Sequence, residues 1–171
     1  MRLLLILRAA VFVGVGLLIT FIQAHTYSVG VLALTIFAFA YALVSALALV
    51  VKRNQLPVVE TLILTVFAVA TAIAALVTTP EASTWLVKLY AVWGIASGLT
   101  ELAQAFRTGR KTNRGRELLI SGALSFAFGL LFALVPLAEL DTVGFFGAYL
   151  ILSAVHLGIA AASERKTPSA L

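Results

Sequence analysis

The chain has 171 residues, of which 62% are hydrophobic and only 11% charged, and its mean hydropathy is +1.10. A soluble domain carries roughly 25% charged residues, so these values exclude an ordinary water-soluble domain and indicate an integral membrane protein. The formal net charge is +5, and the lack of cysteine excludes disulfides and thiolate metal sites.

The apolar runs reach the roughly 20 residues that a helix needs to cross a bilayer. Backbone groups in lipid must bond within the protein, and strand-like alternation is absent, so the runs are predicted to be helices. The first run follows Arg2, but it is too long for a signal peptide and lacks a small-residue cleavage pattern. The predicted spans are 3–22, 27–51, 58–78, 85–106, 117–135 and 142–162. An all-α integral membrane protein with six transmembrane helices is therefore expected.

An internal repeat relates the spans in pairs. Shifts of about 56 and about 52 residues superimpose three sets of residues. These sets are Arg8, Glu60 and Glu117; Tyr41, Trp93 and Tyr149; and Ser45, Ser97 and Ser153. The repeat predicts three tandem helical hairpins, at about 1–53, 54–110 and 111–166, in a single transmembrane domain of residues 1–171 with a short tail at 167–171. Because each unit holds two helices, all three run the same way, which favours a pseudo-threefold axis over an inverted-repeat transporter.

The basic residues gather at one end of the predicted bundle. Eleven of the twelve Lys and Arg residues fall at the termini, in the even loops or close to them, whereas Glu81, Glu139 and Asp141 fall in the opposite loops. Short loops rich in Lys and Arg stay cytoplasmic, so we expect a multi-pass protein of the cell inner (plasma) membrane with both termini cytoplasmic. The expected partners are the lipid bilayer and its anionic headgroups. The basic loop 107–116 lacks aromatic residues, so nucleic acid is not expected.

Small residues recur at four-residue spacing and predict close helix packing. They are Gly94 and Gly98 in the fourth span, Ser121, Ser125 and Gly129 in the fifth, and Gly144, Ala148, Ala154 and Gly158 in the sixth. We expect these faces to pack helices of one subunit, with a homo-oligomer or a larger membrane complex as the alternative. Aromatic residues near the outer span ends are predicted to anchor the protein at the lipid interface. They are Tyr27, Trp85, Tyr90, Phe145 and Phe146.

Five ionisable residues fall in the third of the bundle nearest the basic loops. Glu60 and Glu117 are predicted in the first turns of their helices, where an acid complements the helix dipole. Arg8 is expected to extend toward the headgroups along its apolar stem, or to pair within the membrane. Glu101 either pairs with Arg8 or a cation of loop 107–116, or faces a cavity as a proton relay. His156 is either a hydrogen-bonded packing residue or a proton carrier.

Catalytic motifs are absent from the sequence: there is no HExxH, P-loop or GxSxG pattern. The only aspartate, Asp141, falls in an outer loop, and His25 and His156 are expected on opposite sides of the membrane. We therefore expect no enzyme activity, no catalytic residues, no metal and no cofactor.

Residues 116–136, residues 90–102 and the aromatic residue that precedes a serine in each second helix carry a family resemblance. On these features the chain resembles the HdeD-like membrane proteins, the short-repeat DUF308 family, over nearly its whole length. The first repeat departs most, because its outer turn has no proline and Arg8 stands where the other repeats have Glu. The resemblance implies an inner-membrane protein with a role in acid or stress resistance, and it supplies no catalytic residues.

Three functions are compatible with these features. The first is a non-enzymatic envelope scaffold or stress-resistance component. The second is a small channel or proton-coupled transporter that uses Glu101 and His156, and the third is an accessory subunit of a larger membrane complex. A water-filled path past Glu101 between the two sides favours transport, whereas an apolar, packed axis favours a scaffold.

Overall fold

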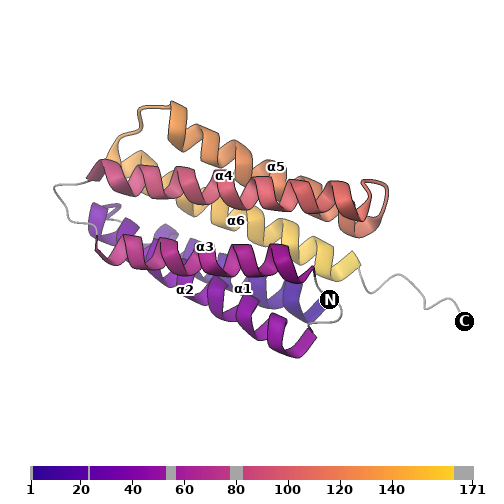
Figure 1. The fold of residues 1–171 in the computed structure, drawn as a ribbon. Helices are drawn as coiled ribbons and strands as arrows, with labels where there is room; N and C mark the ends of the chain where they lie inside the picture. Colours follow the sequence, from indigo (N-terminus) through magenta and orange to yellow (C-terminus); the bar gives the residue numbers. More distant parts are fainter. Residues whose placement is uncertain (1, 23, 53–56, 78–82, 164–171) are drawn as a thin grey trace, which may run out of the picture.

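The computed structural model describes residues 2–22, 24–52, 57–77 and 83–163, and in these ranges it contains six helices and no strand (Figure 1). The helices are α1 (Arg2–Phe21), α2 (Tyr27–Lys52), α3 (Val58–Leu76), α4 (Ser83–Thr108), α5 (Asn113–Leu134) and α6 (Glu139–Ser163). All six are long and apolar enough to cross a membrane. The prediction of an all-α membrane protein with six spans is therefore confirmed.

Two helices begin three or more residues earlier than the sequence predicts. The Thr112 hydroxyl accepts a hydrogen bond from the Gly115 N–H at 3.0 Å and caps α5, so this helix starts at Asn113. Glu117 then lies in the second turn, and its prediction as a helix-start acid is wrong. Glu60, by contrast, lies in the first turn of α3. α6 starts at Glu139 and takes in residues 139–141, which the sequence analysis left in the loop between the last two spans.

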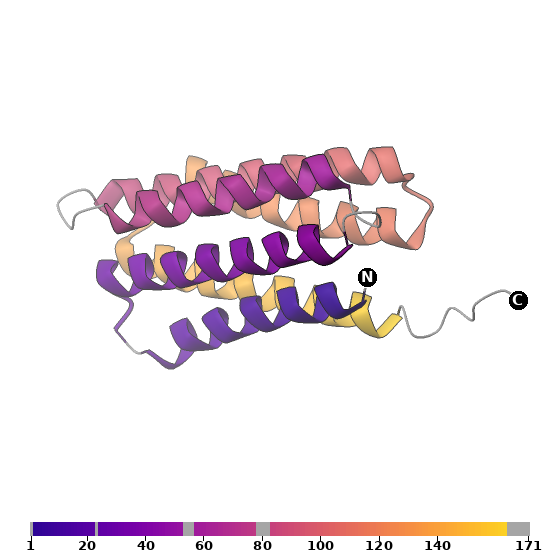
Figure 2. The ribbon, with the colours of Figure 1, turned by 60° about the horizontal axis from the view of Figure 1, so that its bottom comes forward.

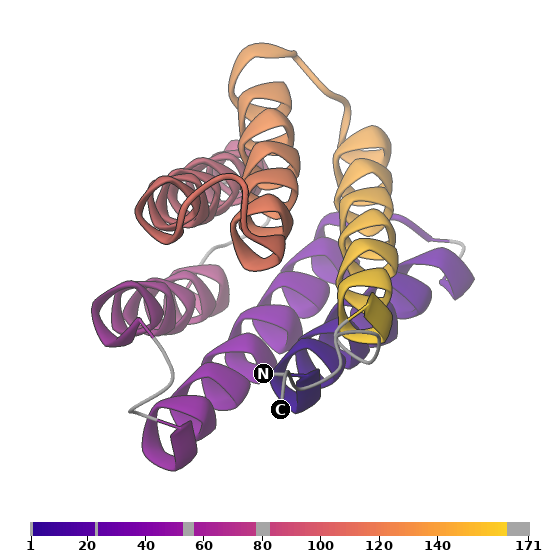
Figure 3. The same cartoon turned by 90° about the vertical axis from the view of Figure 1, so that its right-hand side faces the viewer.

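The helices close into a ring in chain order, seen end-on in Figure 3. The most extensive packing joins helices of successive hairpins, namely α2 with α3, α4 with α5 and α6 with α1. Helices within one hairpin pack less extensively, while α2, α4 and α6 also contact one another. The second helix of each repeat thus packs against the first helix of the next repeat. This arrangement gives the bundle its pseudo-threefold order.

The closest backbone approach lies between α4 and α5. A Cβ atom added at Gly98 would lie 2.5 Å from the Phe126 nitrogen, and one added at Gly129 would lie 2.4 Å from the Ile95 nitrogen. Because dispersion between closely packed backbones holds membrane helices together, this seam needs residues without side chains. Gly94 also lies in the seam, where an added Cβ would be 2.8 Å from the Ser125 carbonyl oxygen.

The small residues of α6 behave differently from those of the α4/α5 seam. An added Cβ at Gly144 or Gly158 would meet no atom within 4 Å, and Ala148 is exposed, whereas Ala154 is buried. Within one chain, the prediction that this helix packs through its whole small-residue pattern is therefore wrong.

Aromatic side chains fill the middle of the bundle. The aromatic layer consists of Phe12, Phe37, Tyr41, Trp93, Phe146 and Tyr149, all of them buried. Their ring centroids form a continuous network at separations of 4.9 to 6.2 Å, mostly in the edge-to-face geometry that aromatic pairs prefer. The repeat-related Tyr41, Trp93 and Tyr149 therefore meet in one layer, as a pseudo-threefold arrangement requires.

Three aromatic residues predicted as interface anchors belong instead to the core. Tyr27, Tyr90 and Phe146 are only 8%, 1% and 1% exposed, and the rings of Tyr90 and Phe146 stack at 4.2 Å. The Tyr90 hydroxyl donates to the Gly30 carbonyl at 3.0 Å. The position of a residue near a helix end does not determine which face of the helix carries its side chain. All three of these rings lie on faces that point into the bundle. Trp85 and Phe145 are exposed, as anchoring requires.

The two ends of the bundle differ in charge. Figures 1 and 2 show α1 beginning and α6 ending at the same end, where α4 also connects to α5. The α4–α5 connection and its flanking turns carry Arg107, Arg110, Lys111, Arg114 and Arg116. We call this the basic end, and it is the end at which the ionisable residues of the site lie.

Candidate functional site

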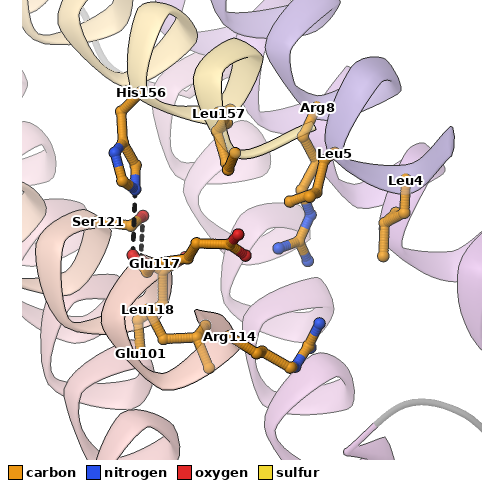
Figure 4. Close-up of a pocket in the computed structure, with 11 residues that line it drawn as sticks. Leu4, Leu5, Arg8, Glu101, Arg114, Glu117, Leu118, Ser121, His156 and Leu157 are labelled. Atoms are coloured by element: carbon orange, nitrogen blue, oxygen red, sulfur yellow. Dashed lines mark hydrogen bonds between the residues drawn. The ribbon is translucent and has the colours of Figure 1, made fainter. Parts of the chain in front are cut away.

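A small polar cavity of about 40 Å³ opens at the basic end between α1, α4, α5 and α6 (Figure 4). It is lined by Leu4, Leu5, Arg8, Glu101, Arg114, Glu117, Leu118, Ser121, His156, Leu157 and Ala160. A second space of about 10 Å³ shares Arg8, Glu101, Ser121 and Leu157 with it and is also lined by residues of the aromatic layer. We call the first space the polar cavity and the second the deep pocket.

Glu101 lies where the two spaces meet. It is seven residues before the last residue of α4, which at 1.5 Å per residue places it about 10 Å inside the helix end. The residue is 8% exposed, and its Oε2 accepts a hydrogen bond from the Ser121 hydroxyl of α5 at 2.5 Å. Glu101 is therefore a buried carboxyl group whose direct partner is neutral.

The predicted cationic partner of Glu101 is not in direct contact with it. Within the described ranges no Lys or Arg nitrogen lies within 4.0 Å of its carboxylate, and Arg107 of the basic loop pairs instead with Glu60. Arg8 and His156 are nevertheless close enough to act on Glu101 electrostatically. The sequence assigned Ser121 only to packing, because nothing but the register of α4 against α5 reveals that its hydroxyl meets Glu101.

Arg8 points into the bundle. Its guanidinium carbon lies 5.0 Å from the centroid of the Tyr41 ring, within the range of a cation–π contact. Its Nη2 donates to the Ser45 hydroxyl at 3.5 Å, a long bond, and its buried Nε has no hydrogen-bond partner. The expectation that Arg8 extends toward the headgroups is therefore wrong, and Figure 4 shows its guanidinium reaching from α1 toward the side chain of Glu117 on α5.

His156 joins α6 to α5. Its Nε2 lies 3.1 Å from the backbone carbonyl oxygen of Glu117. A carbonyl only accepts hydrogen bonds, so Nε2 carries a proton and Nδ1 is the nitrogen left for other contacts. The ring thus makes a hydrogen bond between helices, as the prediction of a packing residue requires. It also lines the polar cavity together with Glu101.

Polar contacts continue from Glu101 into the aromatic layer and stop there. Ser125, one turn beyond Ser121, hydrogen-bonds the Tyr149 hydroxyl at 3.0 Å. Both residues line the deep pocket together with Trp93. Next to Tyr149 lie the rings of Phe12 and Phe146, which offer no hydrogen-bonding atoms. The polar groups of the site are therefore continuous with the basic end and end at the middle of the bundle.

Glu60 lies outside this cluster. Its carboxylate forms an ion pair with Arg107, whose side chain is 73% exposed. Exposed ion pairs contribute little to stability, so this pair is a surface link between α3 and α4. Of the repeat-related residues Arg8, Glu60 and Glu117, only Arg8 and Glu117 line the polar cavity.

The described residues offer no cluster of three His, Asp or Glu side chains that could hold a metal ion. The second histidine, His25, lies after α1, where its Nε2 contacts the Ile19 carbonyl oxygen at 3.1 Å. The side chains around the polar cavity supply donors from Arg8, Arg114 and Ser121, acceptors in Glu101 and Glu117, and the ring nitrogens of His156. This set is suited to holding water and exchanging protons.

Together, these features define the class: a multi-pass helical membrane protein with a polar cavity at its basic end. Residues 63–134 match the family model described as a short repeat of unknown function, DUF308. The match runs from α3 to the end of α5 and includes Glu101, Ser121 and the α4/α5 seam. The predicted resemblance to DUF308 is confirmed over this stretch. No curated protein and no solved structure matches the chain.

Proposed function

We propose that the protein is a non-enzymatic component of the bacterial inner membrane that acts as an envelope scaffold, including under stress. The observation that carries this proposal is the aromatic layer across the middle of the bundle. Phe37 is 0% exposed and Trp93 2%, and their rings meet edge to face with centroids 5.3 Å apart. Closely packed rings leave no room for a solute, which supports a closed, structural bundle.

A second candidate is proton-coupled transport through Glu101 and His156. One observation favours it: the polar cavity brings both side chains to a space that opens at the basic end. Transport would also require a route from Glu101 to the other end. In the structure the rings of Phe12, Phe37 and Phe146 lie across that route. For this reason the scaffold is the first proposal.

Flux measurements separate the two candidates. In sealed proteoliposomes with an imposed pH gradient, we expect proton flux at the level of protein-free vesicles for both the wild type and Glu101→Gln. A protonophore added at the end of each run shows that the vesicles held their gradient. Flux above the protein-free level that Glu101→Gln abolishes, with the variant still folded, would establish transport and overturn the scaffold proposal.

The proposed orientation places both termini and the basic end in the cytoplasm, next to anionic headgroups. Because the chain has no cysteine, single cysteines report sidedness without background. In intact cells an impermeant maleimide is expected to label Ala138→Cys, in the connection between α5 and α6, and to spare Asn113→Cys at the start of α5. Lysed cells are the control, in which both positions must react. Labelling of position 113 from outside would reverse the orientation.

A further inference from the structure

The polar cavity has a feature that a scaffold does not need: charged and polar groups from four helices surround an open space beside a buried carboxyl group. The polar and charged groups that line the polar cavity or the deep pocket beside Glu101 include Arg8 of α1, Tyr41 of α2, Arg114, Glu117 and Ser121 of α5, and Tyr149 and His156 of α6. Buried polar atoms in proteins are nearly always hydrogen-bonded, to protein or to ordered water. Arg8 and Glu101 make one side-chain hydrogen bond each, so their remaining polar atoms require water.

The unsatisfied atoms point to where the water lies. Arg8 has five N–H donors, of which the structure pairs one with Ser45 at 3.5 Å, and its Nε is buried without an acceptor. On the opposite side, the Glu101 carboxylate has several lone pairs and one hydrogen bond, from Ser121. No ion pair within 4.0 Å joins Arg8 to Glu101, so water in the space that both side chains line supplies an acceptor to one and a donor to the other.

The size of the space agrees with this assignment. A cavity needs roughly 10–15 Å³ and two to four polar partners to hold one water molecule. The polar cavity, at about 40 Å³, holds about two or three waters on that scale. The deep pocket, at about 10 Å³, is at the limit for one. Larger solutes do not fit, so water and protons are the ligands that these dimensions select.

Access to the space is one-sided. At the basic end the polar cavity is lined by Arg114, which is partly exposed. Toward the other end, the deep pocket is closed by Phe12 and Trp93, whose side chains are 6% and 2% exposed. A proton that reaches Glu101 along the waters must therefore leave the way it entered.

We propose that the polar cavity is a hydrated inlet through which Glu101 exchanges protons with the solution at the basic end alone. In each exchange, a proton passes between a hydronium or water at the mouth and a Glu101 carboxylate oxygen. The waters relay it, and His156 Nδ1 is a second acceptor beside the path. No net transport follows from this exchange, so the inlet is independent of the scaffold proposal.

Silver ions test the hydration, because Ag⁺ is small, travels through water-filled spaces and binds thiols. Ser121→Cys and Ala160→Cys place a thiol in the polar cavity, and Ala160→Cys leaves the Glu101 hydrogen bond intact. Ala68→Cys is the matched control, since Ala68 is 0% exposed and lines neither space. We expect Ag⁺ applied to the basic end of sealed vesicles to abolish the labelling of the two cavity thiols, but not of the control thiol, when maleimide is added after the protein has been unfolded in SDS. The orientation of the protein in the vesicles is measured by labelling Asn113→Cys with an impermeant maleimide.

Infrared spectroscopy tests the exchange itself. After a pH step on the basic side of sealed vesicles, we expect carboxyl and carboxylate bands that change within the mixing time, shift in D₂O and vanish in Glu101→Gln. The absence of any Glu101 band, or an equal response to a step on the opposite side, would overturn the one-sided inlet. Protection of the cavity thiols from Ag⁺ would overturn it as well. Proton flux in the proteoliposomes would instead contradict the scaffold proposal, so the two failures are distinguishable.

Discussion

Gly98→Ala is expected to lower the melting temperature of the protein in detergent, whereas Gly158→Ala is expected to leave it unchanged or raise it. Both glycines are helical, so the gain in helix propensity, about 0.5–1 kcal/mol, is shared. The difference lies in what the new methyl group meets. At position 98 it would lie 2.5 Å from the backbone nitrogen of Phe126, while at position 158 it would meet nothing within 4 Å.

The collision at position 98 is with backbone, so no side chain can move away to relieve it. α4 and α5 must separate along the seam that also contains Gly94 and Gly129, and dispersion contacts are lost along its length. Overpacking of this kind costs typically about 1–3 kcal/mol, and Gly98→Leu is expected to cost more. Melting curves followed by the fluorescence of Trp85 and Trp93 measure the effect. Equal melting temperatures for the variants at 98 and 158 would show that the α4/α5 seam contributes little to stability.

Because Arg8 and Glu101 interact electrostatically, changing both residues is expected to destabilise the protein less than the sum of the two single changes. Glu101→Gln keeps the shape of the side chain and an oxygen for Ser121, so it removes only the charge. Arg8→Met likewise keeps most of the apolar stem. Each single variant leaves one charge buried without its counter-charge, a costly situation in a low-dielectric interior.

The double variant removes that penalty. A double-mutant cycle that compares the wild type, the two single variants and the double variant should therefore show a coupling of about 0.5–3 kcal/mol in the free energy of unfolding. Since water bridges the two groups in our proposal, we expect a value toward the lower part of this range. A second cycle with Glu117→Gln in place of Glu101→Gln is the control, because Glu117 lines the same cavity. Strict additivity for Arg8 and Glu101, with coupling to Glu117 instead, would assign the counter-charge of Arg8 to Glu117.

The amino-acid sequence alone determined the architecture of this protein. Six apolar runs, too long and too poor in charge for soluble helices, predict six spans because the bilayer permits little else. The repeat that aligns Tyr41, Trp93 and Tyr149 predicts a shared layer, and these three rings do meet in the core. The sequence also placed Arg8, Glu101 and His156 at one depth, because depth follows from position along a helix of known rise.

Only the tertiary structure decided which way each side chain faces. Rotation of a helix about its axis and its register against a neighbour depend on packing of all six helices at once, and an apolar helix in lipid carries little amphipathic signal to set them. For this reason the sequence predicts Tyr90 and Phe146 at the lipid interface, whereas both lie in the core. For the same reason, the turn of Arg8 into the bundle and the bond between Ser121 and Glu101 could not be predicted. The polar cavity exists because of these orientations, which arise from contacts between residues far apart in the chain.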